Sequence, residues 1–140
     1  MRTSSLFEES RTYSPGEVII EQGEDSRDLF YITLGTIEVS VRGEEGGYSH
    51  SELAAPQILG ELSFMDGAPR TATVRAKTEV KAHVIVFENV KDEMAHLPLW
   101  TKPVFRAFSK RIVELNKRIR DLEEKVDAMN ALNEFLLKRE

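Results

Sequence analysis

The last quarter of the chain carries one uninterrupted pattern. No glycine or proline occurs after Pro103, and apolar residues recur there at alternating steps of three and four up to residue 136. This spacing is the heptad repeat of a coiled coil. A helix of about 35 residues is about 50 Å long, which exceeds the width of a domain of about 100 residues. Its far half must therefore find a partner or stay exposed.

The residue types at the two core positions of the heptad favour a parallel two-stranded coiled coil. β-Branched residues dominate one position and leucine the other, while a single core asparagine specifies register and strand number. The alternative is a helix packed on its own domain, which we expect only for the first turns, around Phe105 and Phe108. We predict a homodimer through these side chains: Ile112, Leu115, Ile119, Leu122, Val126, Met129, Asn133 and Leu136.

Between Ser14 and Phe87 the pattern changes to short alternating runs separated by glycine, proline, aspartate and serine. Such runs predict β-strands, and close turns between many of them indicate an antiparallel barrel or sandwich. Gly35 predicts a tight turn, and the glycines of 43–47 predict a hairpin loop. The predicted strands are 17–20, 28–34, 36–41, 48–53, 71–76 and 79–87. We therefore expect two domains, 1–103 and 104–140.

Composition narrows the classes of protein that fit. Apolar residues make up 41% and charged residues 31% of the chain, which is typical of a globular protein. A net charge of −5 disfavours general nucleic-acid binding, and the lack of cysteine excludes disulfides and thiolate chemistry. The start of the chain shows no signal peptide, and no apolar run is long enough to span a membrane. We expect a cytoplasmic protein.

The segment 60–74 reads GELSFMDGAPRTATV and combines features of an anion site. A short helix beginning after Gly60 would present unpaired N–H groups and the positive end of its dipole. Arg70 has the planar fork that suits a phosphate, and Glu61 can accept hydrogen bonds from a hydroxyl. This set fits a ligand with a phosphate and a sugar hydroxyl. Alternatively, Glu61 and Arg70 simply pair with each other on the surface.

The same segment closely resembles the phosphate-binding cassette of the cyclic nucleotide-binding domain, as found in protein kinase A regulatory subunits, cGMP-dependent kinase and bacterial catabolite activators. Upstream, Gly16, the turn 22–24, the run 30–32 and Gly35 extend the resemblance, which covers roughly residues 12–115. Leu59 stands where the family often has phenylalanine. The cassette residues that match are Gly60, Glu61, Leu62, Ser63 (often alanine in the family), Pro69, Arg70, Ala72 and Val74.

The resemblance implies a mainly β fold with α-helices: an eight-stranded antiparallel, jelly-roll-like β-roll with flanking helices, here followed by the predicted coiled-coil helix. It implies that Arg70 binds the exocyclic phosphate oxygens and Glu61 the ribose 2′-hydroxyl. The ligand would be cAMP or cGMP, between which Thr71 is only a weak indicator. Asn116 is a candidate for a contact with the base, the alternative being a solvated side chain. Backbone amides that would complete the phosphate site are near Leu62, Ser63, Thr71 and Ala72.

We therefore expect a non-catalytic cyclic nucleotide sensor that transmits its state through helix 104–140. Two alternatives remain: a structural dimerisation module with a vestigial pocket, or a fragment of a catabolite-activator-like transcription regulator. The sequence is acidic and ends within the predicted coiled coil, so we expect no DNA binding by this chain. The three histidines lack metal-ligand spacing, and no nucleophile–base pair is evident. We expect neither a metal nor a cofactor.

Overall fold

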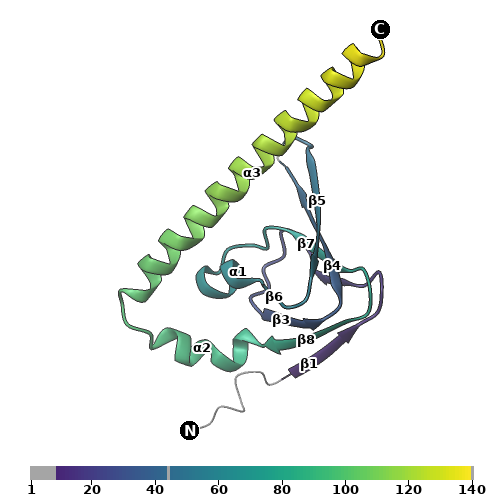
Figure 1. Cartoon of the computed structure of the whole chain (residues 1–140). Coiled ribbons are helices and arrows are strands. Elements are labelled where there is room, and N and C mark those ends of the chain that lie inside the picture. Colours follow the sequence, from purple (N-terminus) through teal and green to yellow (C-terminus); the bar gives the residue numbers. More distant parts are fainter. Residues whose placement is uncertain (1–8, 44, 140) are drawn as a thin grey trace. The chain divides into compact units, whose positions relative to one another are not determined.

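The structure is a computed structural model that describes residues 9–43 and 45–139. The chain divides into two compact units, with the boundary between Lys102 and Pro103. Figure 1 shows the order of the elements along the chain. The strands are β1 (Glu9–Tyr13), β2 (Val18–Ile20), β3 (Leu29–Leu34), β4 (Thr36–Arg42), β5 (Tyr48–Ala54), β6 (Gln57–Leu59), β7 (Thr73–Ala76) and β8 (Val80–Ile85). The helices are α1 (Glu61–Asp66), α2 (Phe87–Ala95) and α3 (Thr101–Leu137).

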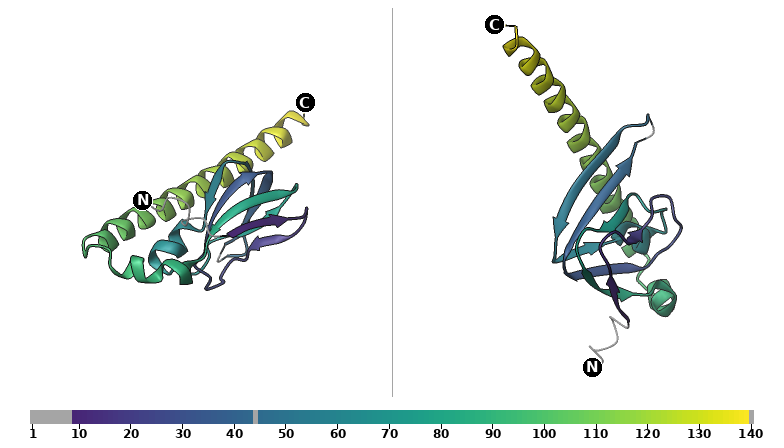
Figure 2. Two further views of the ribbon diagram at one scale, coloured as in Figure 1. Left: turned by 90° about the horizontal axis from the view of Figure 1, so that it is seen from below. Right: turned by 90° about the vertical axis from the view of Figure 1, so that its right-hand side faces the viewer.

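The strands of the first unit form two four-stranded antiparallel sheets. One has the order β1-β8-β3-β6 and the other the order β2-β7-β4-β5. Strands that are neighbours in the sequence often lie in different sheets, so the chain crosses repeatedly between the two layers (Figure 2). The expected eight-stranded antiparallel β-roll with flanking helices and a long C-terminal helix is confirmed. The coiled coil stays a prediction.

All six predicted runs are strands, but their ends differ and two strands were missed. β1 and β6 are edge strands of the same sheet, and β6 has only three residues. The sequence of β1, ESRTY, contains no aliphatic residue, so it gives no alternation to detect. The run 79–87 was expected to be strand throughout. Instead the strand ends at Ile85 and Phe87 begins α2.

Alternate residues of both sheets build the core between them. Ile37 of β4 is fully buried, and so are three residues of the other sheet: Ile32 of β3 and Val80 and Val84 of β8. Because side chains of a strand point to opposite faces in turn, their neighbours point outward and are mostly polar. On β4, for example, Ile37 is buried while Glu38 lies on the outer face of the sheet. The outer face of β4 becomes important below.

Gly35 forms the tight turn between β3 and β4 that the sequence predicted. Its φ is +100°, a backbone conformation that favours glycine. A Cβ atom at this position would lie 2.2 Å from the carbonyl oxygen of Glu79. The carbonyl of Gly35 accepts a hydrogen bond from the N–H of Ala55, 2.9 Å away. The turn thus packs main chain against main chain, with no room for a side chain.

The second unit is α3, a single uninterrupted helix of 37 residues (Figures 1 and 2). Pro103 is its third residue, in the first turn, where the missing N–H has no intrahelical partner to lose. The predicted seam is exposed in the single chain, from 39% at Ile112 to 70% at Met129. Among the residues that the structure describes, none of the helices combines the length and the apolarity needed to cross a membrane.

Candidate functional site

The segment 60–74 folds as a short helix between two glycines. Gly60, with φ +83°, precedes α1, and no side chain caps the helix start. The first intrahelical bond runs from the N–H of Phe64 to the carbonyl of Gly60, 2.9 Å away. The N–H groups of Glu61, Leu62 and Ser63 therefore come before the first bond of the helix ladder, where they can face a ligand.

Arg70 is buried, with 3% of its surface exposed. Its guanidinium donates three hydrogen bonds: from Nε to Ser26 Oγ at 2.9 Å, from Nη2 to the Asp28 carbonyl at 2.7 Å, and from Nη1 to the Gly60 carbonyl at 3.3 Å. The main chain of Arg70 is also fixed. Its N–H donates to the carbonyl of Glu24 at 2.9 Å, and its carbonyl accepts from the N–H of Gly23 at 2.8 Å. The side chain and the backbone are thus held by the same loop.

The charge of Arg70 has no ion-pair partner among the described residues, since no carboxylate oxygen lies within 4.0 Å of it. Burial lowers the pKa of Arg70 from its ordinary value, while the charges of Asp28, Glu24 and Glu61 act in the opposite direction. Removing a charge from water is costly unless an opposite charge faces it. A buried guanidinium surrounded by neutral oxygens is therefore suited to receive an anion.

The alternative of a solvated pair between Glu61 and Arg70 is wrong. Arg70 is buried, and its donors go to Ser26 and to two backbone carbonyls, one of them that of Gly60. Glu61 is exposed at the first position of α1. The structure therefore brings the acidic and basic residues of the segment to one end of the helix without joining them.

The loop before β3 connects this segment to α2. Arg27 donates from Nε to the Ser63 carbonyl at 3.1 Å and from Nη2 to the Phe64 carbonyl at 3.0 Å, and its guanidinium carbon lies 3.8 Å from the centre of the Phe87 ring. The rings of Phe64 and Phe87 meet edge to face, 5.8 Å apart. The neighbouring Asp28 accepts the N–H of Phe87 on Oδ1 at 3.0 Å and so caps α2.

Residues 10–96 match the sequence model of the cyclic nucleotide-binding domain. The chain belongs to this family. The "CRP-like cAMP-activated global transcriptional regulator" of Mycobacterium tuberculosis is 26% identical over 108 residues, which are 76% of this chain and 48% of the regulator.

Two solved structures resemble this cyclic nucleotide-binding domain with the same TM-score and similar sequence identity. A mutant of the cAMP-binding acyltransferase from Mycobacterium smegmatis has 30% identity and a TM-score of 0.54, over 65% of this chain and 28% of that one. The regulatory subunit of a cAMP-independent protein kinase A from Trypanosoma cruzi, bound to guanosine, has 32% identity and a TM-score of 0.54, over 59% and 30%. The chain thus spans about half the length of the first relative and less than a third of the other two.

The remaining predicted site residues of the domain lie in different settings. Ser63 is buried, Gly60, Leu62 and Ala72 are half-buried, and Thr71 is exposed just before β7. Asn116 belongs to α3, in the second unit, so its contact with a base stays a prediction.

Sequence reasoning missed the loop that holds the arginine, namely Ser26, Arg27 and Asp28. The only available signal was its composition: the run EDSRD at 24–28 is entirely polar and stands between two apolar strands. A polar loop of this kind is common, and nothing in its spacing relates it to an arginine 42 residues away. The connection exists only through the crossing of the chain between the sheets.

Sequence spacing also gave no hint that His50 lies beside two carboxylates. Pairing of β4 with β5 brings ligand atoms of Glu38, His50 and Glu52 within 4.8 Å of one another. Glu38 already faces His50, with Oε1 and Nδ1 3.6 Å apart, and Glu52 pairs with Lys77. Glu38 and Glu52 thus already have polar partners. The expectation that the chain binds no metal stays a prediction.

Proposed function

We propose that this domain is a sensor that binds cAMP or cGMP in the cassette 60–72. The observation that carries the proposal is the burial of Arg70 without an anionic partner. A cyclic phosphate would supply the missing negative charge and could accept two parallel hydrogen bonds from the planar guanidinium. The free N–H groups at the start of α1 would donate to the same phosphate. Glu61 would accept the ribose 2′-hydroxyl.

We further propose that ligand binding is transmitted through the loop before β3. A phosphate at Arg70 competes with the carbonyls of Gly60 and Asp28 for the same guanidinium donors. Asp28 also caps α2 through its side chain, and Arg27 bridges the end of α1 and the ring of Phe87. Any shift in this loop therefore changes the contacts that hold the start of α2, which leads along the chain into α3. A ligand drives such a change only by its difference in affinity for the two states.

Isothermal titration calorimetry with cAMP, cGMP, 5′-AMP and guanosine tests the proposal. We expect micromolar or tighter binding of at least one cyclic nucleotide, and at least tenfold weaker binding of guanosine, because it lacks the phosphate that Arg70 requires. The comparison of cAMP with cGMP identifies the preferred base. Failure of both cyclic nucleotides to bind the folded chain would contradict the proposal and favour a structural module with a vestigial pocket.

The Asp28→Ala variant tests the transmission step. Loss of the cap is expected to destabilise α2 by about 1 kcal/mol, because the N–H of Phe87 loses its acceptor. Arg70 bonds the backbone carbonyl of Asp28, and this carbonyl is still present in the variant. The affinity for the ligand should therefore change by less than about threefold, because the substituted side chain does not touch the ligand. Amide hydrogen exchange of residues 87–95, with and without cAMP, measures the effect. Ligand-dependent protection of α2 that is unchanged in the variant would contradict this route.

We propose that α3 forms a parallel homodimer through its exposed seam. Leu122→Lys places a charge in the seam and is expected to convert the dimer to a monomer in sedimentation equilibrium at micromolar concentration. Glu124→Lys introduces the same side chain two residues away, outside the seam, and should leave the dimer intact. Equal behaviour of the two variants would contradict the seam. The division at 103/104, the cytoplasmic location, the non-catalytic role and the lack of DNA binding likewise stay predictions.

A further inference from the structure

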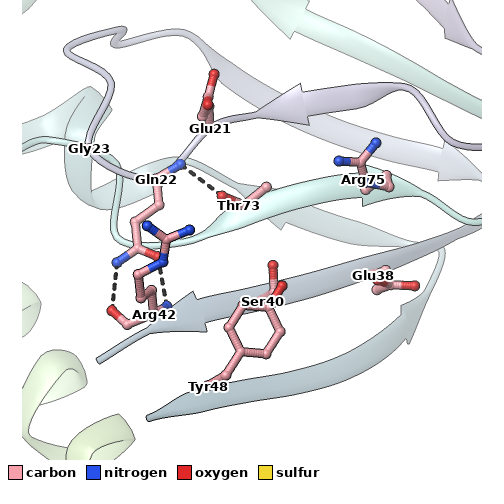
Figure 3. A pocket seen from close by; sticks show the side chains of 9 residues that line it. All are labelled: Glu21, Gln22, Gly23, Glu38, Ser40, Arg42, Tyr48, Thr73 and Arg75. Atoms are coloured by element: carbon pink, nitrogen blue, oxygen red, sulfur yellow. Dashed lines mark hydrogen bonds between the residues drawn. The ribbon is translucent and has the colours of Figure 1, made fainter. Parts of the chain in front are cut away.

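The outer face of the β2-β7-β4-β5 sheet contains a pocket of about 500 Å³, a volume that suits a small organic ligand (Figure 3). Its floor is formed by β4 and β7, one side wall by the loop 21–23 that follows β2, and the other side wall by Tyr48 of β5. None of the nine lining residues belongs to the cassette 60–72. Side chains on this face alternate with the buried core residues of the same strands, so the pocket and the core are separated by the sheet itself.

The pocket floor contains a hydroxyl that has no partner. Ser40 is only 9% exposed, and no described residue makes a hydrogen bond with its Oγ. Its cross-strand neighbour Thr73 accepts the N–H of Gln22 on Oγ1 at 3.0 Å, which leaves the O–H of Thr73 available to donate. Two neighbouring hydroxyls are thus able to donate into one polar space. Among the described residues no buried side-chain oxygen or nitrogen lacks a partner, so the unbonded Ser40 Oγ is open to the pocket, where a ligand can reach it.

Arg42 adds a positive charge beside these hydroxyls. It lies two residues after Ser40 on the same face of β4, and within the described chain its guanidinium has neither a hydrogen-bond acceptor nor a carboxylate within 4.0 Å. Its backbone is fixed, because the amide of Gln22 donates to the Arg42 carbonyl at 3.0 Å and accepts its N–H at 2.8 Å (Figure 3). The backbone at the end of β4 is therefore fixed, while the guanidinium of Arg42 is available to bind an anion.

We propose that this pocket is a second ligand site, which takes a small phosphate ester. Arg42 and the hydroxyls of Ser40 and Thr73 can donate to the phosphate oxygens, while the carboxylates of Glu21 and Glu38, which also line the pocket, can accept hydrogens from the organic part of the ligand. Tyr48, which pairs with Arg42 across the strands and is 67% exposed, offers its ring to the organic part of the ligand. Glu38 at the other end accepts hydroxyl or amino hydrogens.

Titration of the ¹⁵N-labelled chain with 5′-AMP, ribose 5-phosphate, inorganic phosphate and adenosine tests the proposal. We expect the three phosphate probes to shift the backbone amide signals of Ser40 and Arg42, and adenosine to leave them unchanged. Signals of Glu61 and Leu62 report the cassette separately, so binding at one site is distinguished from binding at the other. The outcome here is therefore independent of whether the cassette binds a cyclic nucleotide.

Variants decide whether the named groups bind the probe. Arg42→Gln should weaken 5′-AMP by about tenfold or more, and Ser40→Ala by about threefold to tenfold, as charge-assisted and neutral hydrogen bonds are lost. Lys81→Gln removes an equal charge from the exposed face of the other sheet and should leave the affinity unchanged. The proposal is overturned if no phosphate probe shifts Ser40 and Arg42 below about 10 mM, or if Arg42→Gln binds as tightly as Lys81→Gln.

Discussion

Arg70→Ala is expected to weaken the binding of cAMP by about 100-fold to several thousand-fold. Removal of one partner from a buried charge pair typically costs about 3–5 kcal/mol, and about 1.4 kcal/mol corresponds to a factor of ten in affinity. Arg70→Lys should retain part of the affinity, because an ammonium supplies the charge but not the planar, bidentate fork. Calorimetric titration of the three proteins with cAMP and cGMP measures both effects.

The variant must remain folded for this comparison to be meaningful, and the structure gives a reason to expect it. The backbone of Arg70 stays paired with the loop 23–24 whatever its side chain is. Saturation at about 100 times the dissociation constant should stabilise the unmodified protein by about 2.7 kcal/mol, and the same concentration should stabilise Arg70→Ala by about 0.4 kcal/mol or less. Lys81→Ala, a change of an exposed cation on β8, serves as the control. Binding by Arg70→Ala within about threefold of the unmodified protein would mean that the phosphate is held elsewhere.

Gly35→Ala is expected to destabilise the β-roll by about 3 kcal/mol. The positive φ alone costs about 1 kcal/mol for alanine, and a Cβ 2.2 Å from the Glu79 carbonyl forces the main chain of the turn to move. Urea denaturation followed by circular dichroism measures the loss in the free energy of unfolding.

Gly16→Ala separates the two contributions to this loss. Gly16 has a similar φ of +92°, but a Cβ there would have nothing within 4 Å. It should therefore cost only about 1 kcal/mol. Equal losses in the two variants would show that backbone conformation alone decides the effect, and that the contact with Glu79 is relieved without cost.

Much of the fold was predictable because its signals are local. Alternation located six strands, and the absence of glycine and proline after Pro103 located α3. β1 escaped because its sequence, ESRTY, has no aliphatic residue, and β6 because three residues are too few to show an alternation. The end of β8 was misplaced because Val86 and Phe87 continue an apolar run, although Phe87 already belongs to α2. Its N–H is capped by Asp28, a residue that lies far away in the sequence.

In the candidate site, too, the local features were predictable from the sequence and the long-range contacts were not. The short helix and Arg70 were predicted as parts of one anion site because they are neighbours in the sequence and their chemistry is explicit. The burial of Arg70 and its hydrogen bonds to Ser26 and Asp28 were not predictable, since they depend on how the chain crosses between the sheets. The pocket around Ser40 was invisible for the same reason: Ser40 and Arg42 lie on β4, and nothing in the sequence relates them to Thr73 on β7.

The oxygens that surround Arg70 bear on how the proposed sensor would release its nucleotide. When no nucleotide is present, each donating nitrogen of the guanidinium already has an acceptor in Ser26, Gly60 or Asp28. Departure of a ligand therefore leaves every guanidinium nitrogen with an acceptor, although two of the five N–H groups have none, because the side chain exchanges one set of oxygens for another. Under the proposed function, release of the nucleotide would therefore be as direct as its binding, and the same molecule could be used repeatedly.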